Sequence, residues 1–169
     1  MALVEMQNRG LLKNLVTLNF DGLHRKSGID PAIMIEFYGN TNMEVCSACG
    51  REYLREYRVR TAKTNTDHRT GRQCDTPSCR SALLDTTTSA GEQIAPDLLA
   101  RGLAATGLSD LMIVMGTTMP NDQAYALPFE GRLVMINVEK SRVDGECKLI
   151  IREDPDKVMS LLMQKLSLS

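Results

Sequence analysis

The amino-acid sequence predicts an α/β fold with a parallel sheet that is interrupted once by a small cysteine-rich segment. Three largely apolar runs, at residues 111–115, 132–138 and 149–151, are flanked by helical patterns that start near residues 96 and 154. Runs of this kind are typical of parallel strands that are covered on both faces. The interrupting segment, residues 43–83, is polar, contains two cysteine pairs and keeps neither the helical nor the strand period.

The N-terminal elements follow the same pattern in a shorter form. Residues 2–12 predict a short amphipathic helix. Residues 14–20 are rich in β-forming side chains and run into the Asp21-Gly22 turn, so they predict a strand that ends in a loop. Residues 31–38 predict a short helix, because the proline at its start already has a helical φ angle.

Two later helices have clear N-termini. Pro96 is suited to the first turn of one helix, and Asp154 and Pro155 are suited to the N-cap and first position of the other. Each helix has one apolar face, which supports its assignment. The residues of these faces are Leu98, Leu99, Leu103 and Ala104 in the first helix and Val158, Leu161, Leu162 and Leu166 in the second.

Composition and charge exclude several classes of protein. The 169 residues permit one domain, or one domain with a small insert. Because 20 basic residues balance 21 acidic ones, the basic footprint of a nucleic-acid-binding protein is absent. No run approaches the roughly 20 apolar residues of a membrane span, and residues 1–15 lack the pattern of a signal peptide. We therefore expect an intracellular protein, without distinguishing nucleus from cytoplasm.

The four cysteines of the interrupting segment predict a metal site. Two residues separate Cys46 from Cys49, four separate Cys74 from Cys79, and 24 residues lie between the pairs. Converging pairs of thiolates bind zinc tetrahedrally, and a closed four-thiolate site holds structure rather than performing chemistry. The alternative is four reduced thiols in a loop, which is hard to sustain in a segment with so little apolar core.

Two further residues bear on this site. His68 lies between the cysteine pairs and could compete as a ligand, although a solvent-facing position is favoured. Cys147 precedes the last apolar run and is most simply a small buried apolar side chain.

Polar or turn-forming residues follow three of the predicted strands at the point where each strand ends. In an open parallel sheet, ligands bind at the carboxyl ends of the strands, so these loops predict a ligand-binding edge. The residues concerned are Asn19, Phe20, Asp21 and His24 after the first strand, Gly116, Thr117 and Thr118 after the second, and Asn137 at the end of the third.

The order of these motifs around the cysteine pairs resembles the sirtuin family, the NAD-dependent protein-lysine deacylases, over nearly the whole chain. The stretches that carry the resemblance are 10–28, similar to the family's helix, strand and T-Q-N-x-D-x-L-H loop; 36–40, similar to E-x-H-G-N; 91–92, similar to the end of F-G-E; 110–118, similar to D-x-x-x-x-x-G-T-S; and 136–137, similar to the I-N strand end.

This resemblance implies a partial Rossmann-like NAD-binding domain over residues 1–42 and 84–169 and a zinc-binding small domain over residues 43–83. It implies NAD⁺ and a structural Zn²⁺ as cofactors. It also implies an acyl-lysine protein as substrate, with transfer of the acyl group from the lysine to ADP-ribose.

Site residues are implied by the same resemblance. Asn19 is expected to orient the ribose and the attacking water, and Asp21 with the Phe20 backbone is expected to hold the nicotinamide amide. The positions expected to line the adenosine half of the cofactor are Gly116, Thr117, Thr118 and Asn137.

One departure from the family pattern bears directly on catalysis. The family's proton-accepting histidine falls at Tyr38. A histidine titrates near pH 6.5, whereas only about one unperturbed tyrosine in a thousand is ionised at pH 7. Loss of a general base typically removes a factor of about 10² to 10⁴ from the rate. The alternatives are a tyrosine base with a strongly lowered pKa and replacement of the base by His24.

A second departure concerns the start of the chain. The family's opening strand with its G-A-G-x-S phosphate loop does not occur in the sequence, so the chain resembles an N-terminally truncated member. We expect poor NAD affinity and an unpaired sheet edge that can associate with itself or another chain. Three interpretations follow: an inactive or very weak deacylase, a pseudoenzyme that acts as a zinc-containing binding or regulatory module, and a non-functional remnant.

Overall fold

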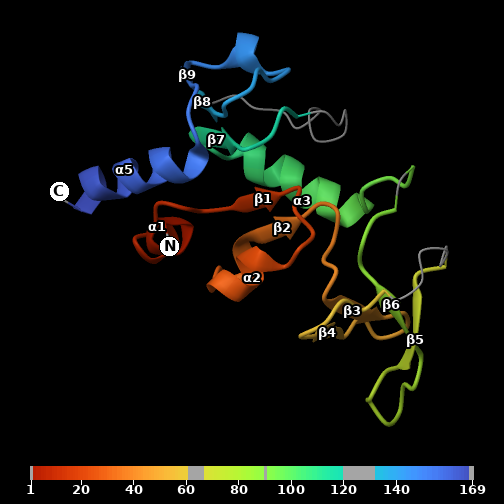
Figure 1. Cartoon of the computed structure of the whole chain (residues 1–169). Coiled ribbons are helices and arrows are strands. Elements are labelled where there is room, and N and C mark those ends of the chain that lie inside the picture. The colour runs from red at the N-terminus through yellow and green to blue at the C-terminus, as the bar shows by residue number, and fades with distance from the viewer. Residues whose placement is uncertain (1, 61–66, 90, 120–131, 168–169) are drawn as a thin grey trace. The chain divides into compact units, whose positions relative to one another are not determined.

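The computed structural model describes residues 2–60, 67–89, 91–119 and 132–167 (Figure 1). The chain divides into two compact units. Unit 1 consists of Met1–Leu12 and Leu99–Ser169, and unit 2 of Lys13–Leu98. None of the described helices is both long and apolar enough to cross a membrane.

Unit 2 begins with a pair of short parallel strands, β1 (Leu15–Thr17) and β2 (Met34–Glu36), in which Leu15 lies opposite Met34. The chain between them contains the helix α2 (Leu23–Ser27) and the 3₁₀ turn η1 (Pro31–Ile33). All three residues of β2 are buried, which places this strand against the apolar interior of the unit.

The second sheet of unit 2 contains the cysteines. It has four antiparallel strands in the order β4-β3-β6-β5. Their bounds are Met43–Cys46 for β3, Glu52–Leu54 for β4, Arg69–Gln73 for β5 and Ala82–Asp85 for β6. The sequence pattern did not predict these strands, because β5 contains no apolar residue and the buried cluster of this sheet is built largely from cysteines.

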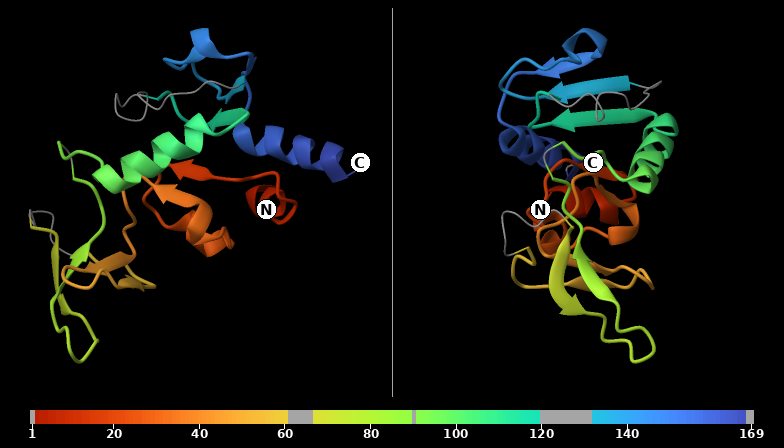
Figure 2. Two further views of the ribbon diagram at one scale, coloured as in Figure 1. Left: turned by 180° about the vertical axis from the view of Figure 1, so that it is seen from behind. Right: turned by 90° about the vertical axis from the view of Figure 1, so that its right-hand side faces the viewer.

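Unit 1 contains a three-stranded parallel sheet, β7-β8-β9. The right-hand view of Figure 2 shows its three arrows pointing the same way. The strands are Leu111–Met115, Arg132–Ile136 and Leu149–Ile151, as the three apolar runs predicted. Within the described residues β7 pairs on one side only, with β8, and association through this edge stays a prediction.

The helices of unit 1 begin where their caps predicted. Helix α5 (Pro155–Ser167) starts at proline, and Asp154 Oδ1 accepts hydrogen bonds from the backbone N–H groups of Asp156 and Lys157 at 2.8 and 3.2 Å. The remaining helical elements are α1 (Ala2–Asn8), α3 (Pro96–Gly107), which contains the boundary between the units, and the 3₁₀ turn η2 (Asp144–Glu146).

One expectation about secondary structure and one about burial are wrong. Residues 31–38 form the turn η1 and the strand β2 rather than a helix, because Met34–Glu36 pairs with β1. Cys147 follows η2 and is only half-buried, with its Sγ 3.1 Å from the Val143 carbonyl oxygen, so it is not a fully buried core residue.

The compact units differ in extent from the domains expected from sequence. The expected boundary separated residues 43–83 from the rest, whereas residues 13–42 share unit 2 with the cysteine-containing sheet. The expected assignment of one domain to the cofactor and one to the metal stays a prediction.

Candidate functional site

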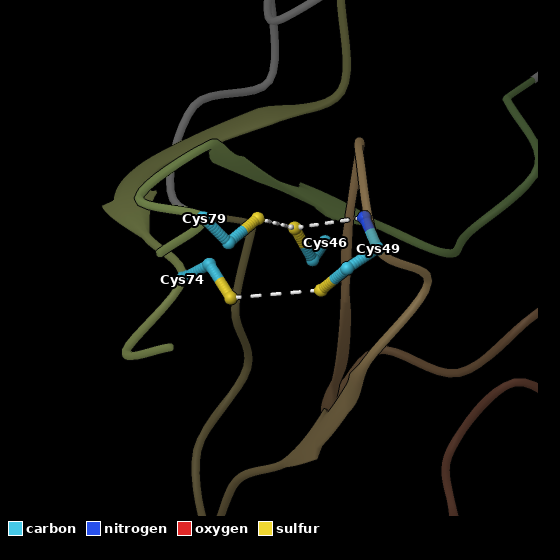
Figure 3. Close-up of side chains that lie close together, drawn as sticks. All are labelled: Cys46, Cys49, Cys74 and Cys79. Carbon is cyan, nitrogen blue, oxygen red and sulfur yellow. Dashed lines mark hydrogen bonds between the residues drawn. The ribbon is translucent and has the colours of Figure 1, made fainter. Parts of the chain in front are cut away.

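The four predicted metal ligands converge in unit 2. Cys46 ends β3, Cys49 lies in the following turn, Cys74 follows β5 and Cys79 precedes β6. All four Sγ atoms lie within 4.8 Å of one another (Figure 3). The Cys46–Cys79 and Cys49–Cys74 sulfur separations are 3.5 and 3.8 Å.

These distances fit a tetrahedral metal. With metal–sulfur bonds of about 2.3 Å, the sulfurs of a tetrahedral site are separated by roughly 3.8 Å. No other group of three or more histidine, cysteine or acidic residues in the described part of the chain converges in this way. The cluster is therefore a possible zinc site, with all four positions filled by protein.

Hydrogen bonds favour the ionised form of two of these thiols by lowering their pKa values. The hydroxyl groups of Thr76 and Tyr53 lower the pKa of Cys74 to about 6. The backbone N–H groups of Cys49 and Ala48 lower the pKa of Cys46. Because a metal binds the thiolate form, these two shifts favour metal binding. The Arg51 backbone N–H lowers the pKa of Cys49, but the hydrogen bond with the Cys46 thiol, desolvation and the other two thiols together outweigh that effect and raise this pKa to about 11.

The cysteines are also the interior of their sheet. Cys46, Cys74 and Leu83 form its buried cluster, and Tyr53 and Cys79 pack against that cluster. Because this cluster is small, it buries little apolar surface. The sheet therefore needs a further connection between its strands for stability.

His68 does not belong to the thiol cluster. Its Nδ1 lies 3.3 Å from Asp85 Oδ1 and its Nε2 lies 2.9 Å from Glu92 Oε1. The expectation of a solvent-facing histidine is wrong, since two carboxylates hold the ring and its side chain is 23% exposed. The hydrogen bond that the His68 ring donates to the Glu92 carboxylate is the main cause of a raised pKa for His68.

The carboxyl ends of β1 and β2 bring a second set of predicted residues together. The Phe37 backbone N–H donates to the Thr17 carbonyl oxygen at 3.0 Å, and the Thr41 N–H donates to the Phe20 carbonyl oxygen at 2.8 Å. The loop that holds Asn19, Phe20 and Asp21 therefore lies beside the turn that holds Tyr38, as parallel pairing of the two strands requires.

The side chains of this first loop are exposed. Asn19 and Asp21 are exposed, and Phe20 is 52% exposed. Asp21 Oδ1 accepts a hydrogen bond from the Leu23 N–H at 3.0 Å, which fixes the turn into α2. The loop can thus present an amide and an aromatic ring to a ligand while its carboxylate supports the turn.

Tyr38 lies half-buried in a turn with fixed backbone geometry. Its carbonyl oxygen accepts a hydrogen bond from the Thr88 N–H at 3.1 Å. The next residue, Gly39, has a φ of 69°, and a Cβ atom there would lie 1.7 Å from the Thr86 carbonyl oxygen. Only glycine fits this position.

A buried ion pair supports the same turn and was not predicted from the sequence. Glu36 accepts from Arg25 Nε at 2.7 Å and from Asn40 Nδ2 at 2.9 Å. Charged residues at 25 and 36 could have drawn attention to a pair, but nothing in their sequence spacing places them in contact.

In unit 1 the remaining predicted residues meet at the ends of β7 and β8. The Gly116 N–H donates to the Ile136 carbonyl oxygen at 3.1 Å, and Asn137 Nδ2 lies 3.3 Å from the Thr117 carbonyl oxygen. The Thr118 carbonyl oxygen accepts from Ser141 Oγ at 3.2 Å. These backbone and side-chain bonds tie both strand-end loops together within the unit.

Arg152 completes this arrangement and was missed from the sequence. Its Nη1 donates to the carbonyl oxygens of Asn137 and Glu139 at 3.3 and 2.8 Å. It also pairs with Asp144. One arginine thereby holds the chain that leaves β8.

Comparison with known proteins places the chain among related sequences. The family model described as the Sir2 family matches residues 1–121. The NAD-dependent protein deacetylase SRT1 of Arabidopsis thaliana is 32% identical over 173 residues, which cover 99% of this chain and 36% of that protein. The NAD-dependent protein deacetylase sirtuin-7 of Bos taurus is 30% identical over 181 residues, which cover 99% of this chain and 45% of that protein.

Solved structures agree with the sequences. A structure of Sir2 bound to acetylated peptide matches with a TM-score of 0.75 and 25% identity, over 99% of this chain and 69% of that one. A histidine-to-tyrosine mutant of Sir2 with a p53 peptide and NAD matches with a TM-score of 0.73 and 25% identity, over 99% of this chain and 70% of that one.

The two curated relatives are considerably longer than this chain, which spans about a third to about half of their length. The family model covers most of the chain, and the fold is the Rossmann-like α/β fold of the matching structures. The chain belongs to the Sir2 family, the sirtuins.

Proposed function

We propose that this chain binds NAD and an acyl-lysine protein, that it holds a structural zinc ion at a separate site, and that it removes the acyl group very slowly or not at all. The observation that carries the proposal is the tyrosine at position 38, in a turn whose backbone is fixed by Thr88 and Gly39.

Zinc is supported by the donor set. Four thiols lie within 4.8 Å of one another, and thiolates are preferred zinc ligands. Because protein fills all four positions, the ion would have no place for a water or substrate. Its contribution would be to tie β3 to the segments that flank β5 and β6.

NAD and acyl-lysine binding are supported by the relatives. SRT1 and sirtuin-7 are named NAD-dependent protein deacetylases, and one matching Sir2 structure is described as bound to acetylated peptide. We assign the ribose and nicotinamide end of the cofactor to Asn19, Phe20 and Asp21. We assign the adenosine half to the strand-end residues of unit 1, Gly116, Thr117, Thr118 and Asn137.

Slow turnover is proposed because of the proton that a base must accept. A tyrosine hydroxyl is a much weaker proton acceptor at neutral pH than an imidazole. The matching histidine-to-tyrosine Sir2 mutant is described with both a p53 peptide and NAD, which supports ligand binding in the presence of such a change in this fold. The loss would therefore fall on the chemical step rather than on binding.

The same tyrosine favours a second candidate function, a binding or regulatory module without turnover. Both candidates bind ligands, and only the rate of acyl transfer separates them. In either case the exposed Asn19 and Phe20 would serve recognition.

The decisive experiment compares nicotinamide release from NAD in the presence of an acetyl-lysine peptide for the unmodified chain, Tyr38→Phe and His24→Gln. We expect both variants to match the unmodified chain, because neither side chain accepts the proton. Calorimetric titration with the peptide and with NAD measures binding in the same samples.

Each result has a defined meaning. Equal rates above background support the slow deacylase, and background rates with measurable ligand binding support the binding module. A tenfold or larger fall in Tyr38→Phe would make the phenolate the base, and the same fall in His24→Gln would make that histidine the base. Either fall contradicts the proposal.

A further inference from the structure

A tyrosine hydroxyl lies directly beside one of the four thiols. Tyr53 Oη, from β4, is 3.1 Å from Cys74 Sγ. The Tyr53 ring has a guanidinium group near it from Arg55 at 5.0 Å and from Arg51 at 5.5 Å, measured to the ring centroid. The phenol is therefore held in place by contacts of its ring as well as its hydroxyl.

The hydroxyl has one proton and two acceptors. It accepts a hydrogen bond from the Asp75 backbone N–H at 3.2 Å, so its own proton is left for Cys74 Sγ or for Asp75 Oδ1, which lies at 2.7 Å. Arg51 Nη1 donates to the same Asp75 oxygen at 3.1 Å. Because this ion pair partly neutralises the carboxylate, Asp75 is a weaker acceptor for the phenol proton.

Burial makes this hydrogen bond difficult to replace. Cys74 is fully buried, whereas Cys49 is exposed and can receive hydrogen bonds from water. A zinc ion with four thiolates carries a net charge of −2, and a buried thiolate without a donor is unfavourable. The Cys46 sulfur accepts a hydrogen bond from the Cys49 N–H at 3.5 Å, and the Cys74 sulfur is hydrogen-bonded by Thr76 and by Tyr53, of which Tyr53 comes from a different strand.

We propose that Tyr53 is a positioning residue of the metal site, whose hydroxyl donates to the Cys74 thiolate, and that Asp75 competes for the proton. This inference rests on the proposed zinc site. Hydrogen bonds to metal ligands from surrounding residues orient the ligands and set their basicity, and loss of one typically weakens metal binding by about 10- to 100-fold.

The test compares Tyr53→Phe with Tyr57→Phe in the full chain. Tyr57 is a matched control, because it is 51% exposed and its ring also lies near an arginine, with Arg72 at 5.6 Å. Zinc affinity is measured by competition with a chromophoric chelator. We expect about 10- to 100-fold weaker zinc binding in Tyr53→Phe and an unchanged affinity in Tyr57→Phe.

Cobalt(II) substitution gives a readout that a purely structural role would not change. Removing a hydrogen bond raises the energy of the thiolate electrons, so the sulfur-to-cobalt charge-transfer band should move to lower energy in Tyr53→Phe. Asp75→Asn removes the competing charge, and the band should move to higher energy. The Asp75 side chain is 66% exposed, so we expect Asp75→Asn to fold. This variant therefore tests the proposal even if Tyr53→Phe does not fold.

The outcomes separate this inference from the zinc proposal. An unmodified chain that binds no zinc or cobalt contradicts the metal site itself. A metal-binding chain whose affinity and charge-transfer band are unchanged in Tyr53→Phe contradicts the role of Tyr53. A shift of the band to lower energy in Asp75→Asn contradicts the competition between Asp75 and Cys74 for the proton.

Discussion

The thiol cluster and the Tyr38 turn both lie in unit 2, yet they are built in opposite ways. In the cluster the side chains converge, and Cys46 and Cys74 form the buried interior of their sheet. In the turn the backbone makes the closest contacts, through the Tyr38 carbonyl oxygen and Gly39. The side chain of Glu36 also supports the turn, through hydrogen bonds from Arg25 and Asn40. The neighbouring Asn19 and Phe20 face outward.

This difference indicates what each region requires from outside the chain. A cluster of converging thiols is completed by one ion, and loss of that ion would remove a tie between the strands. A turn held by its backbone keeps its conformation whether or not a ligand is present. Three changes to the chain test this contrast, beginning with the one that should affect stability most.

Removal of the metal should have the largest effect. Cys74→Ser, or treatment of the zinc-loaded chain with a chelator, should unfold the sheet β3–β6, since structural zinc contributes on the order of 10 kcal/mol in small zinc-binding peptides. Metal analysis and hydrogen exchange of the sheet amides measure the effect. Cys147→Ser is the control, because Cys147 lies outside the cluster. Full zinc content with unchanged exchange in Cys74→Ser would contradict this prediction.

The second effect concerns the Tyr38 turn. Gly39→Ala should lower the free energy of unfolding by about 3 kcal/mol, because the new Cβ meets the Thr86 carbonyl oxygen and φ is positive. Gly28→Ala is the matched control. Gly28 also has a positive φ, of 95°, but nothing lies within 4 Å of its Cβ position, so a loss of only about 1 kcal/mol is expected. Urea unfolding of the zinc-loaded variants measures both free energies of unfolding. Equal losses in Gly39→Ala and Gly28→Ala would contradict the prediction that the contact with the Thr86 carbonyl oxygen is what destabilises Gly39→Ala.

The smallest effect is the dependence of stability on pH through His68. Since Glu92 and Asp85 raise its pKa in the folded chain, protonated His68 stabilises the fold fully below its unfolded pKa of about 6.5. The contribution is lost as pH rises through the higher folded pKa. His68→Gln should therefore destabilise by about 0.5 to 1 kcal/mol at pH 6, and this difference should shrink toward pH 8.5.

A control separates this effect from general acid sensitivity. His24→Gln is the control variant, because no ion pair joins His24 to a carboxylate within the described residues. A difference between His68→Gln and the unmodified chain that grows with rising pH would show that the neutral ring is the stabilising form.

The parts of the fold that were predictable are those with a local cause. Asp154 caps α5 through hydrogen bonds to the next turn, so its effect is contained in a few consecutive residues. Leu111–Met115 forms β7, as its continuous apolar run predicted, although Val114 is the one buried residue of this strand in the described structure. The cysteine spacing likewise predicted which four thiols would meet.

The unpredicted parts depend on residues that are distant in sequence. Met34–Glu36 is a strand because β1 lies beside it, whereas its own sequence is compatible with a helix. The strands of the cysteine-containing sheet are similarly specified by pairing rather than by apolar alternation. The surroundings of His68 depend on Glu92 and Asp85, which approach it from other segments.

The family motifs, the four candidate metal ligands and the tyrosine at position 38 were readable from the sequence, because residue identity and short spacing are sufficient for these. The lack of room for a side chain at Gly39 and the contact of the Tyr53 hydroxyl with Cys74 emerged from the folded chain. Both features are contacts between separate chain segments. Their distances are set by strand pairing and packing, which no local pattern encodes.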